Sequence, residues 1–218
     1  MIKRFWVGSL ALAIGACTTL PRPAPVPSPQ QPSSVAALAA GIAADAKRSD
    51  HEPDSKIRGE LAAEAGRDAE DCIALEPQAA ACLYGRAVAL GLNARAHPAR
   101  AGELLGSMLD ALTRAESADP NYDEAGPARV RALVLIRAPE WPLGPGDAAA
   151  GLAAARRAVA LRPHYPPNLL ALAEALAKTG DGSGARENYA RAREAALALP
   201  AGAERDQWLR EADQGLQR

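Results

Sequence analysis

Aromatic residues are scarce in this 218-residue chain: Phe, Trp and Tyr make up 4% of it, and Phe occurs once. Because strands favour aromatic and β-branched side chains, a large β-sheet is excluded. Alanine, the strongest helix former, supplies about a quarter of all residues instead. Hydrophobic residues reach 48%, which is enough for a globular core. We therefore expect an all-α protein with a core of small side chains.

A strong charge of either sign is also missing. The chain has 25 Lys and Arg residues against 26 Asp and Glu residues, a net charge of −1. Neutralising nucleic-acid phosphates requires a basic stripe, and the sequence has none. We expect no nucleic-acid partner.

Motifs for catalysis are missing as well. The three histidines, His51, His97 and His164, are far apart in sequence and form neither an HExxH string nor an i,i+4 pair. There is no G-x-S-x-G string, and the glycine-rich segment 180–184 lacks the Lys-Ser/Thr of a phosphate-binding loop. Without a nucleophile, base and orienting group, we expect no enzyme activity, no metal and no cofactor.

The N-terminus is typical of an export signal. Two basic residues, Lys3 and Arg4, precede a largely apolar stretch of 12 residues, 5–16, which is too short to span a bilayer. The string Ile14-Gly15-Ala16-Cys17 resembles the lipobox of bacterial lipoproteins. This resemblance implies cleavage after residue 16, lipidation of Cys17 and, since Thr18 rather than Asp follows, an outer-membrane anchor facing the periplasm. The alternative is an ordinary secretory signal with a chance cysteine. Without residues 1–16, 23 basic and 26 acidic residues remain, a net charge of −3.

A proline-rich linker follows at 17–33. Prolines alternate with other residues from Pro21 to Pro29, which blocks helix formation and favours extended polyproline II. At about 3.1 Å per residue, this segment could hold a domain up to roughly 50 Å from the membrane. A proline-rich recognition ligand is the alternative to a tether.

The rest of the chain repeats itself. Pro77, Pro120 and Pro163 are spaced 43 residues apart, and Pro200 follows 37 residues later. Amphipathic segments flank these prolines, and Asp147 is a plausible helix N-cap. Paired helices of fixed period form an α-solenoid, predicted here over 34–200 with a capping helix in 201–218. The expected helices are 34–47, 55–76, 79–92, 103–118, 127–138, 147–162, 167–178 and 203–216, the last with Trp208, Leu209, Ala212 and Leu216 on one side.

The last pair resembles the tetratricopeptide repeat (TPR). Its packing positions are occupied by Leu169, Leu172, Ala173, Leu176, Ala185, Tyr189 and Ala192. A strict repeat has 34 residues, so we expect the extra nine or so in loops at 93–100 and 139–147. Arg86 departs from the pattern because the family has an apolar residue there.

Segment 72–192 also resembles the T-component (TatT-like) lipoproteins associated with TRAP transporters. The strings that carry this resemblance are AACLY at 80–84, EAGPARV at 124–130 and APEWPLGPGD at 138–147. The resemblance implies a periplasmic helical-repeat lipoprotein, a solute-binding protein as partner and a homo-oligomer. We expect Trp141 to fold back onto the solenoid and Asn168 to bond the preceding turn.

Two cysteines remain besides Cys17. Cys72 and Cys82 lie on either side of the Pro77 turn, where antiparallel helix ends bring Cα atoms within the reach of a disulfide. The periplasm is oxidising, so we favour a disulfide over two buried small residues.

In TPR proteins the first helix of each pair lines the concave groove. This implies a partner-binding surface made by Tyr84, Val88, the stretch from Arg131 to Leu135, Leu170, Glu174 and Lys178. Tyr84 could equally pack between repeats. The sequence predicts a scaffold that binds a protein or peptide in the periplasm and touches the membrane through its lipid anchor alone. The alternative is an accessory of a TRAP-type uptake system that engages a solute-binding protein or a small hydrophobic ligand.

Overall fold

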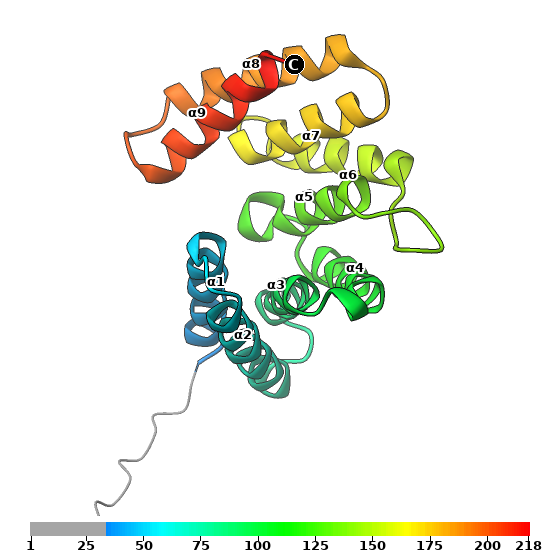
Figure 1. The fold of residues 1–218 in the computed structure, drawn as a ribbon. Coiled ribbons are helices and arrows are strands. Elements are labelled where there is room, and N and C mark those ends of the chain that lie inside the picture. Colours follow the sequence, from blue (N-terminus) through cyan, green and yellow to red (C-terminus); the bar gives the residue numbers. More distant parts are fainter. Residues whose placement is uncertain (1–33) are drawn as a thin grey trace, which may run out of the picture. The chain divides into compact units, whose positions relative to one another are not determined.

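The structure, a computed structural model, describes residues 34–218, which form one compact unit (Figure 1). The predicted signal peptide, the lipidation site Cys17 and the linker 17–33 lie outside the described residues. Within 34–218, no helix is long and apolar enough to cross a membrane. In chain order the helices are α1 (Val35–His51), α2 (Ser55–Leu75), α3 (Ala80–Ala96), the short 3₁₀ helix η1 (Pro98–Arg100), α4 (Ala101–Ala118), α5 (Tyr122–Arg137), α6 (Ala148–Leu161), α7 (Pro166–Lys178), α8 (Gly182–Leu197) and α9 (Ala203–Leu216).

The helices stack in two layers. Each odd-numbered helix packs against the even-numbered helix that follows it and against the next odd-numbered helix. The odd-numbered helices therefore form one continuous layer, and α2, α4, α6 and α8 cover its outer side (Figure 1). This arrangement confirms the predicted all-α solenoid of helix pairs, and α9 packs last, against α7 and α8.

Side-chain caps explain where several helices begin. Four N-cap side chains each accept a hydrogen bond from a backbone N–H in the first turn, which contributes about 1 kcal/mol per cap. They are Ser34, Asp54, Asp147 and Asp181, at the starts of α1, α2, α6 and α8. Asp147 was predicted from the sequence, and its N-cap role is confirmed. Between α7 and α8, Gly180 adopts φ 90°, a left-handed conformation that glycine takes without steric cost.

The core consists largely of alanine and leucine. The residues in the predicted TPR packing positions of α7 and α8 are all buried, and they belong to one cluster that also includes Ala212 of α9. Small side chains let neighbouring helices approach closely. At Gly215 of α9, an added Cβ would overlap the ring of Tyr189.

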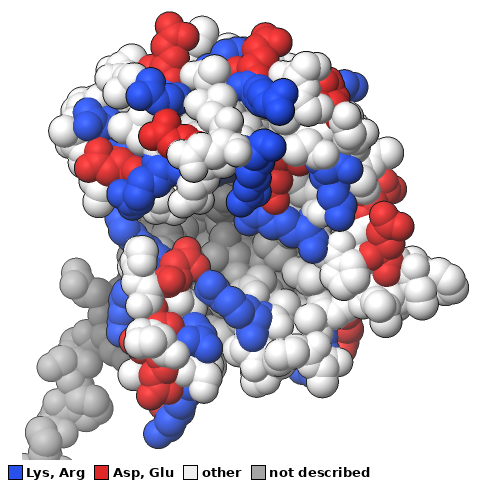
Figure 2. Space-filling model, turned by 45° about the horizontal axis from the view of Figure 1, so that its top comes forward, with Lys and Arg blue, Asp and Glu red and all other residues white. Residues whose placement is uncertain are grey.

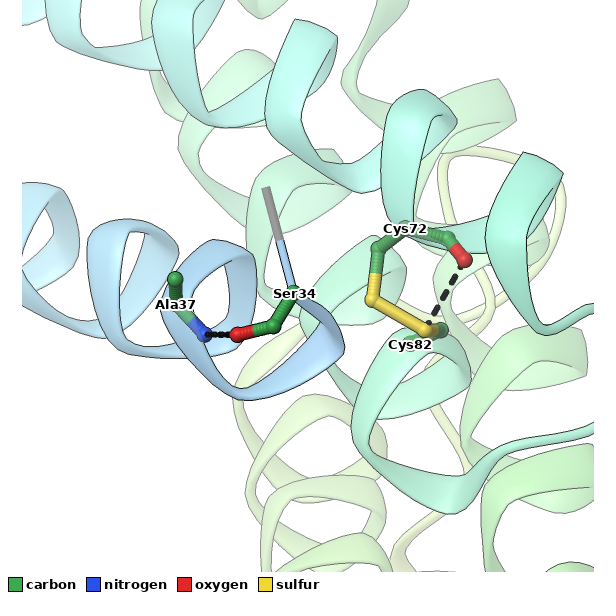
Figure 3. Close-up of a disulfide and its surroundings, with 4 residues drawn as sticks. All are labelled: Ser34, Ala37, Cys72 and Cys82. Carbon is green, nitrogen blue, oxygen red and sulfur yellow. Dashed lines mark hydrogen bonds between the residues drawn. A yellow bond between two sulfur atoms is a disulfide. The ribbon is translucent and has the colours of Figure 1, made fainter. Parts of the chain in front are cut away.

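The two cysteines form the predicted disulfide. The Cα atoms of Cys72 and Cys82 are 5.2 Å apart, and the bridge joins the end of α2 to the start of α3 (Figure 3). Both residues are fully buried, and Leu38 of α1 packs against them. The bridge thus lies in the small core that holds the first three helices together.

Two sequence-based expectations need correction: the loop at 93–100 and the position of Trp141. The expected loop at 93–100 is largely helical, since α3 continues to Ala96 and η1 follows, whereas the loop at 139–147 is present. Near the end of α3, the side-chain amide of Asn93 donates to the carbonyl oxygens of Ala62 and Ala89, which links α3 to α2. The range of α5 starts at Tyr122, but residues 123–125 have left-handed backbone angles, so its right-handed helix starts close to the expected residue 127.

Trp141 does not fold back onto the solenoid. It is 87% exposed, on the loop between α5 and α6, and Leu143 on the same loop is 78% exposed. Local hydrogen bonds fold this loop into a shape that holds both side chains away from the helices, which the sequence pattern did not reveal.

Arg86, the residue that departs from the TPR pattern, does not disturb the packing. Its guanidinium lies 3.7 Å from a carboxylate oxygen of Glu70, between α3 and α2. Its side chain stays 39% exposed, so the charge keeps its contact with solvent.

Candidate binding groove

A cavity of about 460 Å³ lies on the layer of odd-numbered helices. It is bounded by α5, α7 and α9, with Tyr189 contributed by α8. Its apolar lining consists of Leu133, Pro167, Leu170, Ala171 and Trp208. A volume in this range accommodates a peptide side chain or a small organic molecule.

Charged and amide side chains surround the apolar lining. Arg137 of α5 and Glu174 of α7 form a bidentate pair with N–O distances of 2.8 and 2.6 Å. The hydrogen bonds that Arg137 donates to Glu174 raise the pKa of Arg137, so the guanidinium stays charged at any physiological pH. The remaining charged and amide lining residues are Arg129, Gln207, Glu211, Gln214 and Arg218. Both signs of charge are mixed around this hollowed face, as Figure 2 shows.

The two ends of the stack approach each other beside the groove. Lys47 of α1 lies 3.2 Å from a carboxylate oxygen of Glu204 at the start of α9. Both side chains are about two-thirds exposed, so the pair contributes little to stability. The two side chains line a separate surface pocket together with Trp208, which also lines the cavity.

A left-handed turn opens α5 and sets the position of the groove. Asp123, Glu124 and Ala125 have φ values of 47°, 54° and 64°. Such angles cost L-residues roughly 1–2 kcal/mol each, so neighbouring groups must hold the turn in place. The guanidinium of Arg129 does this by donating to the Asp123 and Glu124 carbonyls and, over 2.7 Å, to the Asp123 carboxylate.

Asn168 connects this turn to the following repeat. It is fully buried in α7, and its Oδ1 accepts a hydrogen bond from Arg129. Its amide nitrogen donates to the carbonyl oxygens of Glu124, Ala158 and Arg162. The predicted bond to the preceding turn is confirmed, and Asn168 additionally joins α5, α6 and α7.

A second, smaller cleft of about 250 Å³ lies between α1, α3 and the start of α5. Tyr84 and Tyr122 meet edge to face there, with ring centroids 5.4 Å apart. The Tyr84 hydroxyl donates to the Asp123 carboxylate over 2.9 Å, and burial raises the Tyr84 pKa far above its ordinary value. Other lining residues are small or aliphatic: Ala39, Ile42, Ala43, Ala46, Ala81, Gly85 and Val88.

The structure places the predicted partner-binding residues in three settings. Leu170 and Glu174 line the larger cavity, and Tyr84 and Val88 line the smaller cleft. Tyr84 also packs between repeats, and its role in binding a partner stays a prediction. Lys178 is exposed in the last turn of α7, outside both linings.

Arg131 and Leu135 lie on another side of α5. Arg131 pairs with the buried carboxylate of Glu116 in α4, at 3.2 Å, and Arg157 of α6 pairs with the same group. Leu135 lies against Gly151 of α6. These two residues connect α5 to its neighbours in the outer layer, while the α5 residues that face the cavity are Arg129, Leu133 and Arg137.

Sequence reasoning also missed the contribution of the last helices. Tyr189 and Trp208 line the cavity, although the sequence predicted only packing roles for them. The alternation of inner and outer helices could have indicated α9, because it continues the odd-numbered layer. Within 34–218, no group of His, Cys, Asp or Glu residues is arranged to hold a metal ion.

Comparison with known proteins supports the fold and goes no further. No protein-family model matches the chain, and no curated protein matches it significantly. A thermophilic TPR protein from Thermus thermophilus has a similar structure, with a TM-score of 0.57 and 20% sequence identity. The similarity covers 84% of this chain and 93% of that one. The chain has a TPR-like helical-repeat fold.

Proposed function

We propose that this chain is a non-enzymatic lipoprotein of the outer membrane, facing the periplasm, whose groove binds a protein or peptide partner. The observation that carries the proposal is the cavity of α5, α7, α8 and α9, which combines an apolar lining with a polar edge. TPR-like solenoids commonly use the inner layer of helices as an extended binding surface.

The chemistry of the cavity suits a peptide. Leu133, Leu170 and Trp208 offer an apolar seat for one side chain of the partner. Gln207 and Gln214 on α9 supply amide donors and acceptors for its backbone, which an apolar pocket alone would leave unpaired. Arg137 and Glu174 neutralise each other as an ion pair, so this pair gives the site no strong preference for a positively or a negatively charged peptide.

Photocrosslinking in cells tests this function. A photoreactive residue at Gln214, which lines the cavity, is expected to capture a discrete partner. The matched control is Glu187, exposed on α8 in the outer layer. If both positions give the same adducts, or Gln214 gives none, the groove is not the binding surface.

A role in TRAP-type solute uptake is the second candidate, and the smaller cleft favours it. Its alanine, isoleucine and valine lining suits a small hydrophobic ligand, and the family resemblance supplies a solute-binding protein as partner. A photoreactive residue at Val88 should then capture a solute-binding protein, and native mass spectrometry should detect a lipophilic ligand. An envelope-assembly protein captured at Gln214, with no ligand detected, would refute this candidate and support the scaffold.

The membrane anchor is tested by mass spectrometry of the mature N-terminus. We expect residue 17 to be the first residue and to carry acyl chains. A Cys17→Ser variant is expected to lose the acyl chains and to accumulate with its signal peptide uncleaved. A mature chain that begins elsewhere, without lipid, would refute the lipoprotein assignment while leaving the groove untouched.

A further inference from the structure

The loop between α5 and α6 displays two apolar side chains to solvent. Trp141 and Leu143 are 87% and 78% exposed, more than any other large hydrophobic residue of the described part of the chain. Figure 1 shows the loop projecting from the helices. Because exposing large apolar side chains is unfavourable in water, we expect another molecule or surface to cover Trp141 and Leu143.

The loop is folded in advance of any such contact. Four backbone hydrogen bonds of 2.9–3.3 Å shape it: Gly146 N to Pro139 O, Asp147 N to Leu135 O, and Leu143 N and Gly144 N to Glu140 O. Gly146 fits because an added Cβ would overlap the backbone of Ala138. Docking would therefore cost little conformational entropy in this segment.

Most of the loop backbone has no free donor. Pro139, Pro142 and Pro145 have no N–H to desolvate, and the N–H groups of Leu143 and Gly144 are bonded inside the loop, which leaves those of Glu140 and Trp141 without a backbone acceptor there. Hydrocarbon and interfacial regions penalise unpaired backbone donors, so this pattern lowers the cost of entering them. A protein partner could supply acceptors for backbone N–H groups of the loop, so the scarcity of such groups would give it no advantage.

We propose that Trp141 and Leu143 insert into the interfacial region of a phospholipid bilayer. Tryptophan favours the membrane–water interface, where its ring is covered and its indole N–H stays hydrated. The apolar N-terminal segment and Cys17 bring the chain to a membrane, and the linker of 17–33 leaves the loop within reach of it. This step rests on the membrane attachment in the proposed function, and the loop would add a second point of attachment that orients the groove.

Glu140 sets the lipid preference. It is an exposed carboxylate directly before Trp141 and the one charged residue of segment 138–146. Insertion of Trp141 and Leu143 brings the Glu140 carboxylate to the headgroups, where anionic lipids repel it. Insertion is therefore stronger in zwitterionic than in anionic vesicles, and Glu140→Gln removes the difference.

Tryptophan fluorescence tests the proposal with the mature lipidated chain in phosphatidylcholine vesicles that carry bromine on the acyl chains. Trp208→Phe leaves Trp141 as the one tryptophan of the mature chain, and the matched variant Trp141→Phe leaves Trp208. Bromolipid is expected to quench Trp141 and shift its emission to the blue, while Trp208 stays unquenched. Adding Leu143→Ala to Trp208→Phe is expected to lower the insertion equilibrium constant about tenfold.

Vesicle flotation separates failure of the anchor from failure of the loop. If the chain floats with the vesicles while Trp141 stays unquenched, the anchor holds and the loop proposal is wrong. If the chain does not float, the anchor assignment fails, and the same quenching is measured with vesicles added at millimolar lipid. Unquenched Trp141 in that measurement also overturns the proposal, whereas quenching supports it independently of Cys17.

Discussion

Arg129 and Asn168, 39 residues apart in sequence, are hydrogen-bonded over 3.2 Å in the interior, between α5 and α7. Asn168 is fully buried and Arg129 is 8% exposed. The bond links the left-handed turn of α5 to the helix that forms the next part of the groove. We therefore expect the spacing of these two helices, and with it the shape of the cavity, to depend on this bond.

Replacing Asn168 tests this dependence. Asn168→Ala leaves three carbonyl oxygens and one guanidinium donor without their buried partner, so we expect the free energy of unfolding to fall by about 2–4 kcal/mol. Asn188→Ala is the control, because that buried amide donates to one carbonyl within its own helix. Urea denaturation measures both. Equal losses would mean that Asn168 does not connect the repeats.

The left-handed turn makes an unusual prediction at Glu124. Glycine in a helix interior is normally less stable than alanine by about 1 kcal/mol. At Glu124, where φ is 54°, the order should reverse, with Glu124→Gly more stable than Glu124→Ala by about 1 kcal/mol. Both variants lose the same ion pair with Arg162, so their difference isolates the backbone. The usual order, measured by denaturation, would contradict a left-handed turn.

Close packing of α9 on α8 predicts opposite effects for two Gly→Ala substitutions. Gly215→Ala places a methyl group against the ring of Tyr189, so α9 must shift and stability should fall by about 1–3 kcal/mol. Gly106→Ala in α4 meets no neighbour and should raise stability by up to about 1 kcal/mol. Thermal unfolding checks the pair. A stable Gly215→Ala protein would show that α9 is not packed as described.

Much of the solenoid was predictable, because local patterns specify it. The spacing of Leu169, Ala173 and Leu176 repeats with the helical period, and N-caps such as Asp147 mark helix starts. Burial of these residues follows directly from that pattern.

The sequence did not reveal which residues of α5 face the groove. The stretch from Arg131 to Leu135 covers more than one helical turn, and each residue rotates the side chain by about 100°. The side that faces the groove depends on how the left-handed turn starts the helix, and distant partners such as Asn168 hold that turn. The exposure of Trp141 likewise depends on backbone bonds across the loop, which leave no periodic signal.

The buried carboxylate of Asp45 predicts a pH dependence of stability. Burial raises the Asp45 pKa, and the neighbouring Glu64 carboxylate raises it further, against the opposing charge of Arg48. A folded-state pKa above the unfolded value of about 3.9 means that this group's contribution to stability is complete below that pH and is lost as pH rises through the folded-state pKa. Asp45→Asn should therefore be more stable than the wild type at pH 7, and this advantage should disappear near pH 4.

Asp110→Asn serves as the control, since Asp110 is exposed on α4. Thermal unfolding of the three proteins between pH 4 and 8 gives the comparison. A loss of stability in Asp45→Asn at pH 7 would mean that the charged form of Asp45 stabilises the fold.

The central claim is that a partner occupies the groove between α5, α7 and α9. Leu133 is partly exposed in its lining, so Leu133→Trp would fill the cavity with little disturbance of the core. The most direct measurement is photocrosslinking in cells from Gln214, with and without Leu133→Trp, after confirming that the two proteins unfold at similar temperatures. We expect the Gln214 adduct to disappear when the cavity is filled. An adduct that persists at the same yield would contradict the account, because the partner would then bind elsewhere.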